Sequence, residues 1–92
     1  MSLPVVWRVE AVDDLVGISS FIAEHDQYAA LALVQRIELA AIKLSDFPYL
    51  APNGRVPGTR ELVVHPNYIL VYQVTSLTVE ILGVLHARQQ YP

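Results

Sequence analysis

Residues 60–74 read RELVVHPNYILVYQV, and residues 79–92 read VEILGVLHARQQYP; these two stretches decide the fold of the chain. Their β-branched and aromatic residues predict three strands, at 59–64, 68–74 and 78–85. The connections at 65–67 and 75–77 have lengths typical of β-hairpins. The middle run is nearly all apolar, so we expect it to be a central strand.

The N-terminal half predicts a short strand followed by two helices. The run VVWRV at 5–9 favours a first strand. From about Ala11 the apolar period becomes helical, with Asp13 and Asp14 expected in the first turn. The first helix should end near residues 24–25, and Asp26 is a candidate N-cap for the second. The predicted apolar stripes are Ala11, Leu15, Ile18 and Ile22 in the first helix, and Ala30, Leu33, Val34, Ile37, Ala41 and Leu44 in the second.

Residues 47–58 hold three prolines and two glycines, which predicts a structured loop. The element order is therefore βααβββ in a single domain over residues 1–92. We expect an α+β fold in which an N-terminal strand joins a mainly antiparallel four-stranded sheet, and a helical hairpin packs on one face of that sheet. The other face, called the open face below, is expected to carry unburied apolar side chains.

The composition indicates a surface for a partner. Hydrophobic residues are 53% of the chain and charged residues 16%, against about 25% charged in typical domains. A domain this small cannot bury so much apolar side chain alone. The formal charge of −3 argues against nonspecific nucleic-acid binding. No signal peptide or long apolar run is visible, so we expect a cytoplasmic protein without membrane contact.

Five side chains near the C-terminal strands form the candidate site. We expect them to converge at one edge of the open face and to bind a phosphate or carboxylate there. They are Arg55, Arg60, His86, Arg88 and Tyr91. In the alternative interpretation, Arg60 pairs with Glu61 or Glu80, and Tyr91 only caps the sheet edge.

His86 is the one candidate general base in this group. The three histidines lack the spacing of a metal site, and the glycines do not form a phosphate-binding loop. We therefore expect neither a metal nor another cofactor.

The order of these motifs resembles the RelE/ParE superfamily of toxins from type II toxin–antitoxin modules. The segments PYLAPNGRVPG at 48–58, RELVVHPNY at 60–68 and VLHAR at 84–88 look most like its ParE branch. The resemblance implies one of two activities. RelE-type members are ribosome-dependent endoribonucleases with several basic residues on the open face, whereas ParE-type members poison DNA gyrase and are not nucleases.

Apolar residues at two positions decide between these activities. Ile69 follows Tyr68, and Leu62 shares a face with Arg60, where a nuclease of this type would need cations to stabilise phosphate charge. The resemblance therefore favours a ParE-like gyrase inhibitor of a plasmid-stabilisation module, neutralised by a cognate antitoxin. The five candidate residues would then contact the target.

Two alternatives stay open. The first is a RelE-like mRNA endoribonuclease that acts on the ribosome, with Arg60, His86, Arg88 and Tyr91 as its catalytic residues. The second is an inactive toxin-like binding module. Whether the chain is an enzyme thus depends on the target. Free of its antitoxin, the chain is also expected to be able to form a homodimer.

Overall fold

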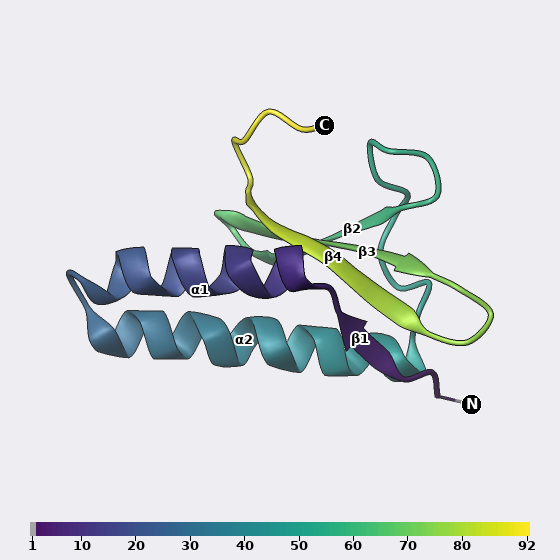
Figure 1. Ribbon diagram of the computed structural model, residues 1–92, viewed down its shortest axis with the longest axis horizontal. Helices are drawn as coiled ribbons and strands as arrows, with labels where there is room; N and C mark the ends of the chain where they lie inside the picture. Colours follow the sequence, from purple (N-terminus) through teal and green to yellow (C-terminus); the bar gives the residue numbers. More distant parts are fainter. Residues whose placement is uncertain (1) are drawn as a thin grey trace.

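The computed structural model describes residues 2–92 and has the predicted element order βααβββ (Figure 1). The elements are β1 Val5–Trp7, α1 Val9–Ala23, α2 Gln27–Asp46, β2 Arg60–His65, β3 Tyr68–Val74 and β4 Val79–His86. Among these residues, neither helix combines the length and apolar character needed to cross a bilayer.

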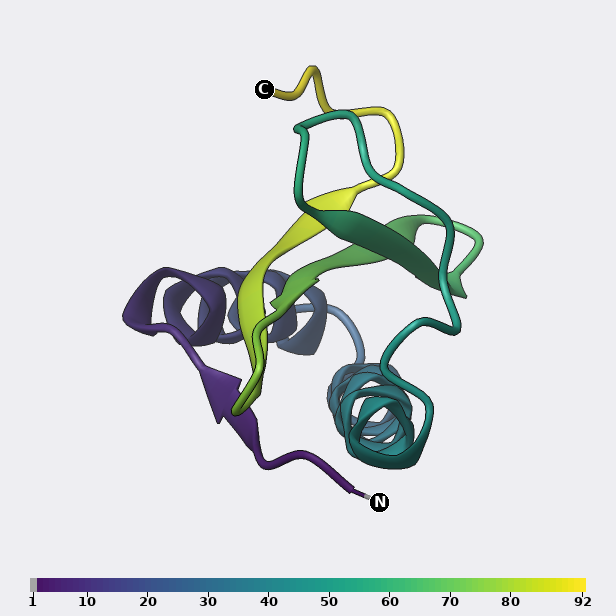
Figure 2. The same cartoon turned by 90° about the vertical axis from the view of Figure 1, so that its right-hand side faces the viewer.

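The four strands form one sheet in the order β1-β4-β3-β2. β1 runs parallel to β4, and the other neighbours are antiparallel. The prediction of a mainly antiparallel sheet with β3 inside is therefore confirmed. Both helices lie on one side of the sheet (Figures 1 and 2), which confirms the α+β arrangement.

The helical stripes predicted from the sequence face the sheet. In α2, Ala30, Leu33, Ile37, Ala41 and Leu44 are buried, and Val34 is half-buried. They pack against the helix-facing side chains of the strands, of which Tyr72, Leu70 and Ile81 are the largest that are fully buried. The cap of α2 is also confirmed, because the Asp26 carboxylate accepts a hydrogen bond of 3.0 Å from the Ala29 N–H.

The start of α1 differs from the prediction. The helix begins at Val9, directly after the shorter strand β1, so its first-turn acid is Glu10 rather than Asp13 or Asp14. Asp14 instead accepts a hydrogen bond of 3.0 Å from the backbone N–H of Val84. The predicted first-turn carboxylate thus ties α1 to β4.

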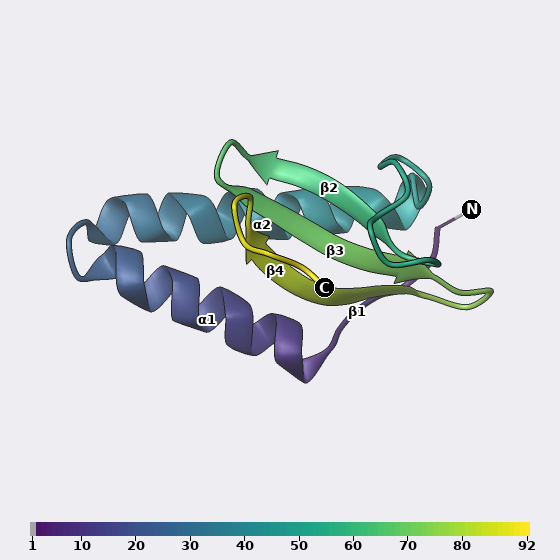
Figure 3. The same cartoon turned by 90° about the horizontal axis from the view of Figure 1, so that it is seen from above.

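The exposed apolar side chains lie mostly on the helices and the 47–58 loop, which corrects the expectation for the open face. On that face Ile69, Val71 and Leu85 are buried, with Tyr91 packed against them. Figure 3 shows that the chain after β4 turns back over the sheet. The large hydrophobic residues exposed on the helices are Val9, Val12, Val16, Phe21, Tyr28, Leu31, Leu39 and Ile42.

Candidate functional site

The five predicted site residues do not meet at one edge; the structure separates them into three places. Arg55 and Tyr91 come together on the open face, with the guanidinium carbon 5.5 Å from the centre of the ring. Arg60 lies on the helix-facing side of β2, and His86 and Arg88 lie at the far end of β4. The expectation that all five converge was therefore wrong.

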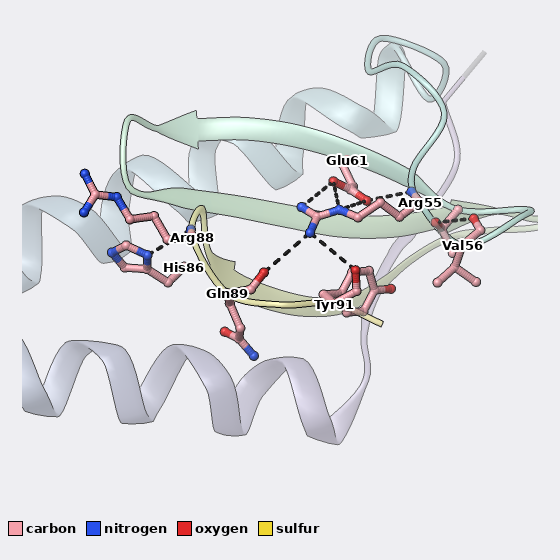
Figure 4. Close-up of polar contacts among 8 residues, drawn as sticks. Arg55, Val56, Glu61, His86, Arg88, Gln89 and Tyr91 are labelled. Atoms are coloured by element: carbon pink, nitrogen blue, oxygen red, sulfur yellow. Dashed lines mark hydrogen bonds and ion pairs between the residues drawn. The ribbon is translucent and has the colours of Figure 1, made fainter.

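Arg55 is held by a dense set of contacts on the open face (Figure 4). Its guanidinium donates to the Glu61 carboxylate at 3.1–3.2 Å, and its backbone N–H donates to the same carboxylate at 2.8 Å. The guanidinium also donates to the carbonyl oxygens of Gln89, at 3.5 Å, and Tyr91, at 3.4 Å. The bonds that Arg55 donates to the carboxylate hold the pKa of Glu61 below its usual value of 4.5, and the bond from the backbone N–H contributes most.

The last residues of the chain form a strap over the open face. We call residues 87–92 the C-terminal strap. The strap starts with a backbone hydrogen bond of 2.7 Å from the Ala87 N–H to the Asn67 carbonyl. Its far end is fixed by Tyr91, whose side chain packs on the apolar patch that contains Val71 and whose carbonyl contacts Arg55. Arg55 therefore connects the 47–58 loop, β2 and the strap.

Arg60 takes a different role from the predicted one. It pairs with Tyr72 across the β2–β3 ladder and so shares a face with Leu62, against the helices. Its guanidinium donates to the Ala51 carbonyl at 2.6 Å and lies 4.9 Å from the centre of the Tyr49 ring. It anchors the loop before β2.

The carboxylate partners proposed for Arg60 are both engaged elsewhere. Glu61 pairs with Arg55, as described above. Glu80 accepts a hydrogen bond of 2.6 Å from Gln73 and one of 3.2 Å from Arg8. Both bonds lower the pKa of Glu80, and the bond from Gln73 has the larger effect. Arg8 and Arg55 are thus each neutralised by one carboxylate.

His86 lies in a row of aromatic rings beside a cleft. Tyr68 stands between His65 and His86, with ring centres 5.7 and 5.5 Å away. The Nδ1 atom of His86 accepts a hydrogen bond of 3.1 Å from the backbone N–H of Arg88. The adjoining cleft has a volume of about 460 Å³ between α1 and β4, and its lining includes His86, Asp13 and Asp14.

The acidic wall of this cleft was missed by the sequence reasoning. Asp13 and Asp14 were interpreted only as helix N-terminal charges, yet both line the cleft beside His86. β1 runs parallel to β4 and is followed by α1, which begins at Val9. The first turns of α1 therefore lie beside β4. Two carboxylates next to a histidine favour a cationic ligand over a phosphodiester, because like charges repel.

Within residues 2–92, no three histidine, aspartate or glutamate side chains gather closely enough to hold a metal ion. Arg88 is exposed at the beginning of the strap, and its guanidinium points away from the Arg55 cluster (Figure 4).

The chain is similar in sequence to several known proteins. The sequence profile of a family described as "ParE toxin of type II toxin-antitoxin system, parDE" matches residues 5–91. The Sinorhizobium fredii protein Y4kP, whose name describes a toxin, is 40% identical over 94% of this chain and 90% of its own length. Toxin RelE2 of Caulobacter vibrioides is 35% identical over 90% of this chain and 93% of its own length.

Two solved toxin–antitoxin structures share the fold. The chromosomal ParDE system of P. aeruginosa has a chain that superimposes with a TM-score of 0.79 at 21% identity, over 92% of this chain and 96% of that one. The RelBE2 complex of Mycobacterium tuberculosis gives a TM-score of 0.62 at 24% identity, over 94% of this chain and 99% of that one. At these identities the likeness concerns the fold alone.

Proposed function

Since the chain belongs to the family of ParE toxins of type II toxin–antitoxin systems, we propose that it is a ParE-like toxin that inhibits DNA gyrase. A cognate antitoxin neutralises it. The names of its relatives include both branches of the superfamily, so the choice between gyrase and the ribosome rests on the chemistry of the chain itself.

The observation that carries the proposal is the charge on the open face. Arg8 and Arg55 are each paired with a glutamate, and the apolar centre at Val71 lies against the Tyr91 side chain of the strap. A nuclease needs cations directed at the phosphate oxygens where negative charge develops in the transition state. Cations already neutralised by carboxylates serve this purpose poorly, which supports a toxin that acts by binding.

The proposal is tested in cells by inducing the chain alone. Growth should stop, and plasmid DNA extracted after induction should be cleaved or lose negative supercoiling while cellular mRNA stays full length. Continued growth of cells that accumulate the folded chain would favour the inactive binding module instead.

The exposed apolar side chains of the helices support an antitoxin partner. Solved neighbours of this fold are toxin–antitoxin complexes, and large exposed apolar patches mark interfaces. We expect the product of an adjacent gene to co-purify with the chain and to gain ordered structure on binding. Calorimetry should give a negative heat-capacity change, the mark of apolar burial. A non-toxic chain without affinity for any such product would contradict this prediction.

The nuclease alternative has one specific candidate, His86, which is exposed beside Tyr68 and the cleft. If His86 contributes only contacts, His86→Gln should leave growth arrest within about twofold, because glutamine keeps hydrogen bonding but does not titrate. A general base would instead lose roughly 10²–10⁴-fold in rate. The measurement is the inducer concentration needed for arrest, with folding checked by circular dichroism.

The arginines near the sheet provide the comparison. Arg88→Ala removes an exposed cation, and Arg60→Ala removes the one beside Tyr49. For a toxin that acts by binding, Arg88→Ala should weaken target affinity by about 1–3 kcal/mol. Arg60→Ala also releases the loop that Arg60 anchors through the Ala51 carbonyl, so its effect should appear in stability as well as in affinity. A folded His86→Gln variant that still binds its target but no longer arrests growth would transfer the assignment to the RelE-like alternative.

A further inference from the structure

The cleft between α1 and β4 contains two carboxylates that the chain itself leaves without a cation. Asp13 and Asp14 both line it, and helix α1 has no basic residue. Asp14 accepts one hydrogen bond, from the Val84 N–H, although a carboxylate has about four acceptor positions. Both ion pairs described for residues 2–92 use glutamates, so neither aspartate has a cationic partner there. An uncompensated pair of carboxylates attracts a cation.

Aromatic rings form another part of the lining. Phe21, Tyr68 and His86 contribute them, and the rings of Tyr68 and His86 stand edge to face with their centres 5.5 Å apart. The side chain of Gln89 points from the strap toward α1 and adds an amide oxygen to the lining (Figure 4). Rings attract a cation placed over their faces, while carboxylate and amide oxygens accept hydrogen bonds from it. A guanidinium suits both kinds of wall, because it is flat and has five N–H donors.

One wall of the cleft has no side chain, because Gly17 lies there in the middle of α1. Glycine is disfavoured in helix interiors, and the backbone does not require it here, since the φ angle of Gly17 is not positive. Packing does not require it either, because a Cβ atom at this position would have no neighbour within 4 Å. The missing side chain leaves the cleft open to an occupant from outside.

We propose that the antitoxin inserts an arginine side chain into this cleft, with the guanidinium between the two aspartates and the aromatic rings. The volume of about 460 Å³ is within the range of sites for small ligands and therefore admits one long side chain. This inference rests on the antitoxin partner proposed above and names the chemical group by which that partner is recognised.

The surface beside the cleft favours the antitoxin as the source of the arginine. Asp13, Gly17 and Phe21 follow one another at four-residue steps, so they form one row along α1. The exposed side chains of Val12 and Val16 form the neighbouring row. A partner that packs on these apolar side chains therefore has the cleft within reach of its own long side chains. The formal charge of −3 also attracts a basic segment.

The first experiment measures the affinity of the cleft for an isolated guanidinium. Butylguanidinium, which mimics the end of an arginine side chain, is titrated into the full-length free chain, and amide chemical shifts are followed. We expect saturable shifts around Gly17 and Val84, with a dissociation constant of about 1 mM. Butylurea has the same shape without the charge and should bind about tenfold more weakly. Equal binding of the two compounds, or shifts scattered over the whole surface, would overturn the proposal.

The second experiment measures the affinity of the antitoxin, the product of the adjacent gene, by calorimetry. Asp13→Asn keeps the shape of the side chain and removes its charge, so the affinity should fall about tenfold. Glu24→Gln is the matched control, because it makes the same change of charge at the exposed far end of α1, outside the cleft. It should alter the affinity by less than about twofold.

The opening at Gly17 is tested by filling it. Gly17→Leu places a large side chain in the cleft and should weaken antitoxin binding by about tenfold or more. Gly17→Ala adds one methyl group and should weaken it by less than about threefold. Both substitutions favour the helix, so both variants should unfold at a higher urea concentration than the unmodified chain, as measured by circular dichroism. Equal affinities of the two variants would mean that nothing enters the cleft at this point.

The inserted side chain is identified by replacing the arginines of the antitoxin with glutamine, one at a time. One replacement should weaken binding to the unmodified chain about tenfold, yet have little further effect on binding to Asp13→Asn, because that contact is already lost. If every replacement has the same effect on both forms of the chain, no arginine of the antitoxin contacts Asp13.

The results distinguish this inference from the proposal of an antitoxin partner. An antitoxin that binds the unmodified chain and the variants at Asp13 and Gly17 equally well would overturn the assignment of the cleft alone. A chain to which no product of an adjacent gene binds would overturn both, even if butylguanidinium enters the cleft.

Discussion

Replacing Tyr72 with phenylalanine is expected to lower the free energy of unfolding by about 1–3 kcal/mol. Tyr72 is fully buried, yet its hydroxyl donates to the Pro48 carbonyl at 2.8 Å and accepts from the Ala51 N–H at 3.3 Å. Phenylalanine preserves the packing but leaves two polar backbone groups of the loop without this partner. Tyr72→Ala adds a cavity and should cost about 3–5 kcal/mol.

Tyr68→Phe is the matched control, because Tyr68 lies on the same strand and packs against the same core. Among the contacts described for residues 2–92, its hydroxyl has no hydrogen bond, so the change should stay within about 0.5 kcal/mol. Urea unfolding followed by circular dichroism measures both. Equal losses for the two variants would mean that the Tyr72 hydroxyl does not anchor the loop.

The same hydroxyl gives a pH dependence. Burial raises the pKa of Tyr72 above its usual value of 10.0, so the phenol is held in its neutral form. The resulting stability is present below pH 10 and is lost as the pH rises through the raised pKa. The loop that carries Tyr49 and Arg55 is therefore anchored throughout the neutral range.

Arg55→Ala is the second substitution with a large expected effect. It removes the bonds to Glu61 and to the carbonyls of the strap. We expect a loss of about 1.5–3 kcal/mol, because the hydrogen bonds are charge-assisted and the Glu61 carboxylate, 14% exposed in the intact pair, loses its cation. Amide hydrogen exchange should rise in residues 87–91 as the strap detaches, and Val71 beneath it should become accessible.

Arg8→Ala is its control, since Arg8 forms the other ion pair on the open face. Its side chain is more exposed than that of Arg55 and does not contact the strap through any described hydrogen bond. The loss of stability should therefore be smaller, and exchange in the strap should not change. If both variants loosen the strap equally, Arg55 is not its specific anchor.

Lowering the pH should loosen the C-terminal strap in the same way as Arg55→Ala. The pKa of Glu61 lies below its usual 4.5 in the folded chain. Its contribution to stability is thus present above pH 4.5 and is lost as the pH falls through the lowered pKa. Protonation of Glu61 weakens the bond from Arg55, and the strap loses its clamp.

Local patterns predicted the helices well. The stripe of α2 is read directly from its period, because only one side of that helix is covered by the sheet. The Asp26 cap was predictable because its carboxylate accepts a hydrogen bond from the Ala29 N–H, only three residues later in the sequence.

The candidate site could be predicted only in part, because it depends on contacts between distant residues. Strand alternation correctly placed Arg60 and Leu62 on one face, but only the packing of the helices decides which face is covered. The meeting of Arg55 with Tyr91 joins residues 36 positions apart, without any local signal. A bulge near Val71 also shifts the register of β4, so simple alternation does not hold along that strand.

The most direct test of a gyrase-inhibiting toxin is a paired assay with one preparation of purified chain. Increasing amounts are added to a gyrase supercoiling reaction and, in parallel, to a translating extract in which mRNA is followed by primer extension. We predict that supercoiling is inhibited, that added antitoxin reverses the inhibition, and that the mRNA stays intact at every concentration. Cleavage of ribosome-bound mRNA by a preparation that leaves gyrase fully active would contradict the proposal.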